Sequence, residues 1–395
     1  MENNATLEHD GVTIKLVEGD DALQQVVAGL SQSQELALDL EFDQNRFTYG
    51  FNLCLIQITD GRGTCYVIDP FTMATLQPLF QLLENEGITK IIHHANNDIL
   101  LLDKLGCNIR GVMDTDVAAK ILNYERSSLA TVMKEEFNIE VDKSQQSSNW
   151  NKRPLTNEQL RYAAIDVIYL HRVKAKLVTR IEELDRSHWL KEENKLLEAL
   201  RYSEPENPHL KLRNAFRLTL YQQYILKEVF AFRDEMGQQF NKPAPYVISN
   251  EAILELALTP DTDVHEWLNH TKGIHGGLKR AQNEQKLRDT LAEAIASAKE
   301  KQISHDYPSN RFQRPIRTPE AEQRKEDLVK VQQRIVEQYG EFASRLIMTT
   351  STINEYAYNN QLRCTKQYAS DILAATAQAL SISLPKATFK ASDRS

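Results

Sequence analysis

The chain has 395 residues, of which 41% are hydrophobic and 26% are charged, and its formal net charge is −8. This length suits two or three domains, and the negative charge argues against a protein that coats nucleic acid through bulk electrostatics. With four scattered cysteines, no leader pattern and no apolar stretch near the roughly 18–20 residues that cross a bilayer, the sequence predicts a cytoplasmic protein without a membrane partner, disulfide framework or zinc ribbon.

The first part of the chain alternates strand patterns with helix patterns. The predicted strands are 12–17, 36–42, 53–58, 64–68 and 90–93, and the predicted helices are 20–30, 75–83, 98–105 and several from 114 onward. The turn Asp60–Gly63 makes the third and fourth strands an antiparallel hairpin, whereas the later strand is separated from them by a helix. This pattern predicts an α/β fold in which helices flank a mixed β-sheet.

The strand signal nearly vanishes after the linker Ser203–His209. Amphipathic helix patterns fill 210–301, and a linker rich in proline and arginine covers 304–319 before a last helical region. We therefore expect an α/β domain at 1–202, all-α domains at 210–301 and 318–385, and a mobile tail at 386–395.

Two short patterns bring acidic side chains together. In the strand Glu35–Phe42, a period of two puts Asp39 and Glu41 on one face, while leucines occupy the other. In an apolar helix further on, Tyr162 and Asp166 are four residues apart and share a face. A buried aspartate without a partner is costly, so we expect these carboxylates to converge on divalent metal ions, which remove their mutual repulsion.

Asp98 follows the strand 90–93, at the end of a strand where sheet-based active sites collect. Each of these residues also has a simpler interpretation. Asp39 and Glu41 can face solvent from a strand, Asp98 can interact with a helix dipole, and a lone tyrosine is most often a core aromatic. If the carboxylates do converge, hard oxygen donors without histidine or cysteine suit Mg²⁺ or Mn²⁺ rather than zinc.

Three motifs stand in a fixed order along the chain. They are Leu38-Asp39-Leu40-Glu41-Phe42, a strand ending in His93 with Asp98 five positions later, and Tyr162-x-x-x-Asp166. Between them lie Asp114-Thr-Asp-Val-Ala-Ala119 and Trp150-Asn-Lys-Arg-Pro-Leu155. Over residues 12 to about 180 the chain thereby resembles the ribonuclease D family, the DEDD-type 3′–5′ exonucleases of the tyrosine subclass. Residues 210–300 resemble its HRDC domain, and 320–385 occupy the position of a second, more divergent helical module.

The resemblance implies a ribonuclease H-like sheet and a metal-dependent hydrolase that releases nucleoside 5′-monophosphates. It implies two divalent ions, Mg²⁺ or Mn²⁺, and no organic cofactor. Asp39 would bridge both ions, and Glu41 and Asp166 would hold the ion that activates water. Asp98 would reach the second ion, directly or through water. Tyr162 would orient the attacking water, because a phenol with the ordinary pKa of about 10 is a poor base at neutral pH.

Candidate substrate contacts lie beside these motifs. Phe42 is a candidate for stacking on a terminal base, although a core role explains it equally well. Lys152 and Arg153 are candidates for phosphate contacts, although a solvated loop needs no such role. His93 ends an apolar strand, so we expect a hydrogen-bonded core residue there rather than a metal ligand.

The expected partner is RNA with a free 3′ end, such as a structured tRNA precursor. Because carboxylates address phosphates and not sugars, a 3′–5′ exonuclease acting on single-stranded DNA is an alternative. A non-catalytic nucleic-acid-binding scaffold is another, although a scaffold has no chemical need for all four carboxylates and Tyr162. The sequence leaves open the oligomeric state, and whether the helical domains bind nucleic acid or only shape a channel.

Overall fold

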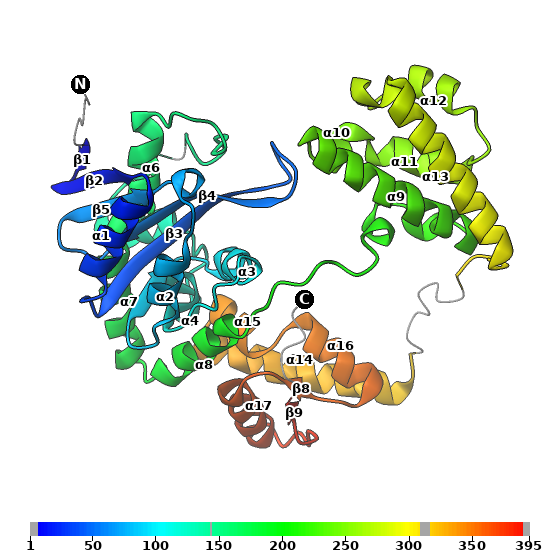
Figure 1. The fold of residues 1–395 in the computed structure, drawn as a ribbon. Helices are drawn as coiled ribbons and strands as arrows, with labels where there is room; N and C mark the ends of the chain where they lie inside the picture. Colours follow the sequence, from blue (N-terminus) through cyan, green and yellow to red (C-terminus); the bar gives the residue numbers. More distant parts are fainter. Residues whose placement is uncertain (1–6, 143, 309–316, 390–395) are drawn as a thin grey trace, which may run out of the picture. The chain divides into compact units, whose positions relative to one another are not determined.

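The computed structural model describes residues 7–142, 144–308 and 317–389 (Figure 1). Within these ranges the chain forms two compact units. The first comprises 7–41, 53–203 and 317–389, and the second comprises 42–52 and 204–308. None of the helices in the described ranges is long and apolar enough to span a membrane. The four cysteines are buried and form no disulfide with one another.

A seven-stranded mixed sheet forms the centre of the first unit, with strand order β1-β2-β5-β4-β3-β6-β7. The strands are β1 (Leu7–His9), β2 (Val12–Val17), β3 (Glu35–Gln44), β4 (Phe51–Thr59), β5 (Thr64–Ile68), β6 (Thr89–Ile92) and β7 (Val112–Asp114). β4 pairs with β5 in the antiparallel direction, whereas β3, β6 and β7 run parallel. The register pairs Ala37 with Ile91, so Asp39 comes level with the residues that follow β6.

The structure confirms the predicted mixed sheet, and each predicted strand appears within two residues of its expected bounds. Two strands of this sheet were missed. β1 pairs antiparallel with β2, and β7 pairs parallel with β6. Each has only three residues, which is too short for a period-two pattern to be recognised.

In the described part of the first unit, eight α-helices precede residue 203. They are α1 (Asp20–Leu30), α2 (Gln77–Glu84), α3 (Asn96–Lys104), α4 (Thr115–Ile121), α5 (Leu129–Phe137), α6 (Asn157–Ile168), α7 (Leu170–Glu183) and α8 (Ser187–Glu198), with a short 3₁₀ helix η1 (Pro70–Thr72). A capping box starts α6, because Thr156 and Gln159 each accept the main-chain N–H of the other. Ala163 and Val167 of α6 pack into the sheet core, and this packing fixes the orientation of the helix.

Four further helices, α14 (Pro319–Tyr339), α15 (Glu341–Ile347), α16 (Thr350–Asn359) and α17 (Gln367–Ala379), belong to the same unit. The ring of Tyr368 stacks on Trp189 of α8, with centroids 4.6 Å apart. Beside this stack, Lys366 donates to the buried carboxylate of Glu193 at 2.6 Å. The region that we expected as a separate domain at 318–385 is therefore packed against the unit that contains the sheet.

The junction of α14 and α15 requires a glycine. Gly340 has φ 91°, and a Cβ at this position would lie 2.2 Å from the side chain of Asn123. The Asn123 Oδ1 atom accepts the main-chain N–H groups of Phe342 and Ala343 at 2.7 and 3.1 Å. The close approach of the backbone to Asn123 thus helps to hold the last helices on the unit.

Part of the tail predicted to be mobile from 386 is described by the structure, and its mobility stays a prediction. β9 (Thr388–Phe389) pairs in parallel with β8 (Arg363–Cys364), and the N–H of Thr388 donates to the carbonyl of Leu362 at 2.9 Å. A two-residue strand carries no readable sequence pattern, so the sequence did not predict this pairing. Residues 390–395 lie outside the described ranges.

The second unit is helical, apart from the segment 42–52 and an isolated bridge between Ile248 and Ile274. Its helices are α9 (Leu220–Phe240), α10 (Ala244–Val247), α11 (Asn250–Leu258), α12 (Val264–His270) and α13 (Ala281–Glu300), with 3₁₀ helices η2 (Pro208–Lys211), η3 (Ala215–Arg217) and η4 (Gly276–Lys279). Phe232 and Leu287 lie in its buried core. The loss of strand signal after residue 203 predicted this composition.

Candidate active site

Three carboxylates from two elements meet in the first unit. Asp39 and Glu41 project from β3, and Asp166 projects from α6. One oxygen of each lies within 4.8 Å of the others, and in the described part of the chain no other trio of histidine, cysteine or acidic side chains meets this criterion. Residues that the sequence paired within one strand and within one helix are thus brought together by the packing of α6 on the sheet.

Asp98 lies in the first turn of α3, directly after β6. Its side chain is 5% exposed, and its Oδ1 atom has no hydrogen-bond partner among the described residues. Burial and the charge of Asp39 raise the pKa of Asp98 well above its usual range. A buried carboxylate oxygen without a donor is costly, so this atom indicates a partner from outside the chain.

The electrostatics of the cluster favour a cation. Burial raises the pKa of Asp39 to about 7. Burial also raises the pKa of Glu41 well above its usual range, and repulsion from the other three carboxylates adds to this effect. Acidic groups that oppose one another's ionisation are stabilised by a bound positive charge, and hard oxygen donors fit a divalent cation.

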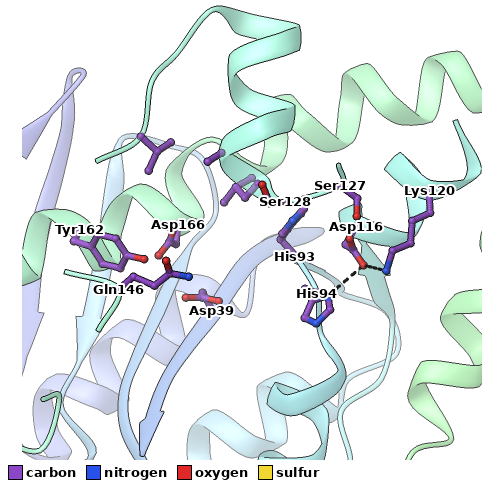
Figure 2. Close-up of a pocket in the computed structure, with 13 residues that line it drawn as sticks. Asp39, His93, His94, Asp116, Lys120, Ser127, Ser128, Gln146, Tyr162 and Asp166 are labelled. Carbon is purple, nitrogen blue, oxygen red and sulfur yellow. Dashed lines mark hydrogen bonds and ion pairs between the residues drawn. The ribbon is translucent and has the colours of Figure 1, made fainter. Parts of the chain in front are cut away.

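Tyr162 lines the same cavity as Asp39 and Asp166, and Figure 2 shows its hydroxyl on the side of these two carboxylates. Burial, and then the negative charge of Asp166 and its neighbours, raises the pKa of Tyr162 above its usual range. The ring of Trp150 packs against the tyrosine, with centroids 6.1 Å apart. Tyr162 therefore presents a protonated, well-supported hydroxyl that is able to donate a hydrogen bond.

The carboxylates border a cavity of about 440 Å³ that continues past α4 and the start of α5. Asp39, Tyr162 and Asp166 line one part of it. The other part is polar and is lined by His93, His94, Asp116, Lys120, Ser127 and Ser128 (Figure 2). A cavity of this volume is in the range of small-molecule sites, and both parts face the same space.

The two histidines at the end of β6 differ in their surroundings. His93 is held by Thr115, with 2.9 Å between Nδ1 and the hydroxyl, and burial lowers the pKa of the imidazole. This is the hydrogen-bonded residue expected from the sequence. The side chain of His94 is 64% exposed and approaches Asp116 with its Nδ1 atom at 3.3 Å.

The structure contradicts the predicted phosphate contact of Arg153. All five of its guanidinium N–H groups already donate within the chain, to both oxygens of Asp69 and to the carbonyls of Cys54, Trp150 and Lys152. The guanidinium also lies over the ring of Phe71, 4.6 Å from its centroid. Since no donor is left for a phosphate, Arg153 has a structural role.

Lys152 and Phe42 are the other two predicted substrate contacts, and their surroundings in the structure differ. Lys152 is exposed, and its main-chain N–H donates to the carbonyl of Asn149 at 3.1 Å. Phe42 packs edge-on against Phe51, with ring centroids 5.2 Å apart. For both residues a substrate contact remains a prediction.

The sequence analysis noted Asp114–Ala119 only as a motif and predicted no role for the residues that shape the turn after β6. The carboxylate of Asp114 accepts the main-chain N–H groups of His94, Ala95 and Asp116 at 3.0, 2.9 and 2.8 Å. Two signals were present: an aspartate directly before a helix is a common N-cap, and Asp116 and Lys120 have the i, i+4 spacing of a helical ion pair. Neither signal shows that His94, more than 20 positions upstream of Asp116, joins them.

The chain is similar in sequence to known 3′-5′ exonucleases. A family model described as 3′-5′ exonuclease matches residues 14–182. The ribonuclease D of Desulfotalea psychrophila is 31% identical over 259 residues, which are 64% of this chain and 69% of the relative. The ribonuclease D of a Shewanella strain is 31% identical over 284 residues, which are 69% of this chain and 73% of the relative.

Solved structures show the same fold. The crystal structure of Escherichia coli ribonuclease D matches with a TM-score of 0.70 and 22% identity, over 93% of this chain and 99% of that chain. A protein from Bifidobacterium adolescentis matches with a TM-score of 0.73 and 18% identity, over 91% and 92%. The arrangement of a mixed sheet and helical regions is thus shared along nearly the whole chain.

Proposed function

The chain belongs to the ribonuclease D family and is a 3′–5′ exoribonuclease, and from this premise we propose that it shortens structured RNA such as tRNA precursors from a free 3′ end. The observation that carries the proposal is the cluster of Asp39, Glu41 and Asp166, whose oxygens lie within 4.8 Å of one another. Their half-buried side chains and the open cavity beside them provide a place where a phosphodiester would meet bound cations.

Asp39, Glu41 and Asp166 would hold divalent cations, Mg²⁺ or Mn²⁺, and Asp98 would complete the set of oxygen donors. When bound, two such ions polarise the scissile phosphate, acidify the attacking water and stabilise the leaving oxygen. The raised pKa values of Asp39, Glu41 and Asp98, together with the partnerless Oδ1 of Asp98, support this assignment.

Orientation of the attacking water is assigned to residues of the chain itself. Because the pKa of Tyr162 is raised, its hydroxyl stays protonated at neutral pH and donates a hydrogen bond to orient the attacking water. Proton removal is therefore not assigned to Tyr162. The rigid attachment of Tyr162 and Asp166 to one helix, α6, keeps the orienting hydroxyl and a metal-binding carboxylate in a fixed relation.

The test compares the wild-type chain with Asp166→Asn on matched 5′-labelled RNA and DNA, resolved to single nucleotides. Each substrate is incubated with Mg²⁺, with Mn²⁺ and with EDTA. A metal-dependent ladder that shortens from the 3′ end and is lost in Asp166→Asn supports the proposal. A faster reaction on DNA would favour the alternative DNA exonuclease, and binding without cleavage of either substrate would favour the scaffold.

We also propose roles for the two helical regions that follow residue 203. Residues 210–301 would be the HRDC domain of the family, and the helices from Pro319 onward its second helical module. Both would help to handle long RNA rather than take part in the chemical step. The cytoplasmic location remains a prediction.

A further inference from the structure

A second charged cluster lines the cavity opposite the carboxylates. The Asp116 Oδ2 atom accepts from Lys120 Nζ at 2.5 Å and lies 3.3 Å from His94 Nδ1. The Asp116 side chain is only 6% exposed, whereas those of Lys120 and His94 are 39% and 64% exposed. A buried carboxylate therefore holds the side chains of Lys120 and His94 at the surface of the cavity, as Figure 2 shows.

The backbone is shaped to place His94 in this position. His94 has φ 64°, in the left-handed region that few residues other than glycine adopt, although histidine adopts it more often than most. The N–H groups of His94 and Ala95 both donate to Asp114, and this bonding holds the turn after β6 in place. A strained conformation that is held by specific hydrogen bonds and lines a cavity is typical of functional sites.

His94 and Lys120 have hydrogen-bond donors that Asp116 does not use. Although burial acts in the opposite direction, hydrogen bonds from His94, Lys120 and Ser127 hold the pKa of Asp116 below its usual range. The bond to Asp116 in turn raises the pKa of His94. An ionised Asp116 occupies one donor of each side chain, which leaves further N–H groups of Lys120 for an anion, and also the Nε2–H of His94 when the imidazole is protonated.

We propose that His94 and Lys120, oriented by Asp116, bind the RNA phosphate that lies one linkage upstream of the scissile one. This inference rests on the proposed function. In an RNA with a free 3′ end, the scissile linkage contains the last phosphate of the chain. Any second phosphate that enters the same cavity must therefore come from the 5′ side, where the cation pair would neutralise it.

This subsite would set the register of the substrate. With the upstream phosphate on His94 and Lys120, the terminal linkage is held at the carboxylates of β3 and α6, and each cut requires the chain to advance by one nucleotide. Since the contact is made equally before and during the reaction, its loss should appear mainly in KM. His94 and Lys120 are thus positioning residues with respect to the chemical step.

The test is a chemical double-mutant cycle on the first cleavage event. A short single-stranded RNA is compared with the same RNA carrying an uncharged methylphosphonate at the penultimate linkage. For the wild-type chain we expect kcat/KM to fall about tenfold or more, mostly through KM, since a charge-assisted contact is lost. For His94→Ala/Lys120→Ala we expect a similar fall on native RNA and no further fall on the modified RNA.

Two variants serve as controls for charge and folding. Lys120→Arg retains a cation on Asp116 and should keep most of the sensitivity to the modified linkage. Lys134→Ala removes an exposed lysine that pairs with Glu140 at 2.9 Å and does not line the cavity, so it should behave as wild type. Moving the methylphosphonate one linkage further upstream should also reduce its effect.

The outcomes separate the two proposals. If wild type cleaves native and modified RNA equally well, the subsite is overturned while the exonuclease function stands. If His94→Ala/Lys120→Ala remains as sensitive to the modification as wild type, the assignment to these residues is overturned. If wild type cleaves neither RNA in the presence of Mg²⁺ or Mn²⁺, the proposed function fails, and the subsite fails with it.

Discussion

Buried charges occur in this molecule in two different settings. In the carboxylate cluster, burial raises the pKa of Asp39, and Asp39 in turn helps to raise the pKa values of Glu41 and Asp98. At the contact between α8 and the last helices, the buried Glu193 accepts a hydrogen bond from Lys366 at 2.6 Å. In the carboxylate cluster, the negative charge needs a ligand to balance it. At the contact of the last helices, Lys366 balances the charge of Glu193 within the chain.

The comparison shows how buried charge separates function from architecture. A charge pair closed within the chain, such as Lys366 with Glu193, stabilises packing and needs nothing further. A group of like charges is unfavourable for folding and is retained only where a cation or a reaction requires it. The predictions below test this distinction by removing one charged residue at a time from each setting.

The largest effect is expected from Asp39→Asn in the carboxylate cluster. Activity on 5′-labelled RNA with Mn²⁺ should fall by about 1,000-fold, because a metal-binding charge is lost. In EDTA the same variant should melt at a higher temperature than wild type, because repulsion with Glu41 and Asp98 is relieved. Gel analysis of cleavage and thermal unfolding with and without metal measure both effects. A variant that is inactive but less stable in EDTA would contradict the idea of unbalanced charge.

At the contact of the last helices, Lys366→Met should destabilise the chain by about 3–5 kcal/mol, because Glu193 is left buried without its cation. Denaturant unfolding measures this change. Adding Glu193→Leu should recover part of the loss, since an apolar pair of similar volume replaces the charges. Equal stability of the single and double variants would show that the ion pair is not what Lys366 supplies.

Arg153→Ala should lower stability by about 2 kcal/mol, less than Lys366→Met, because the Arg153 side chain is partly exposed while its partner Asp69 is buried. Lys152→Ala is the matched control and should change stability by no more than about 0.5 kcal/mol. The KM for short RNA, measured on the folded fraction, should be unchanged in Arg153→Ala. A raised KM with unchanged stability would restore the original prediction of a phosphate contact.

The sequence was sufficient where a site is built from local patterns. Asp39 and Glu41 are two apart on a strand, Tyr162 and Asp166 are four apart on a helix, and each pair shares a face for that reason alone. The position of Asp98 after an apolar strand added the last carboxylate. Parallel pairing of β3 with β6 then brings these local patterns to one place.

The sequence was insufficient where partners are distant and no periodicity joins them. Arg153 and Asp69 are 84 positions apart, and nothing near Arg153 shows that its donors are all used within the chain. Lys366 and Glu193 are 173 positions apart, so the sequence did not predict that the last helices pack against α8. Such pairs depend on how the elements pack, and packing is not encoded in the spacing of residues along one element.

The smallest expected effect concerns the pH dependence of metal binding. With the pKa of Asp39 raised to about 7, the folded chain without metal binds a proton that the unfolded chain, with a normal pKa near 3.9, has already lost. This contribution to the stability of the metal-free chain is therefore present at low pH and is lost as the pH rises through 7. A bound cation competes with that proton, so metal binding should strengthen over the same interval.

The increase in melting temperature caused by Mn²⁺ should therefore be larger at pH 8 than at pH 6, by a few degrees at a fixed metal concentration (roughly the shift that 1 kcal/mol produces). Melting curves at both pH values, with Mn²⁺ and with EDTA, measure it. Asp39→Asn is the control, because it lacks the titrating group and should lose most of this pH dependence. If the increase in the wild-type melting temperature caused by Mn²⁺ does not depend on pH, the carboxylates are already ionised without a cation. The contrast between the carboxylate cluster and the Lys366–Glu193 pair would then fail.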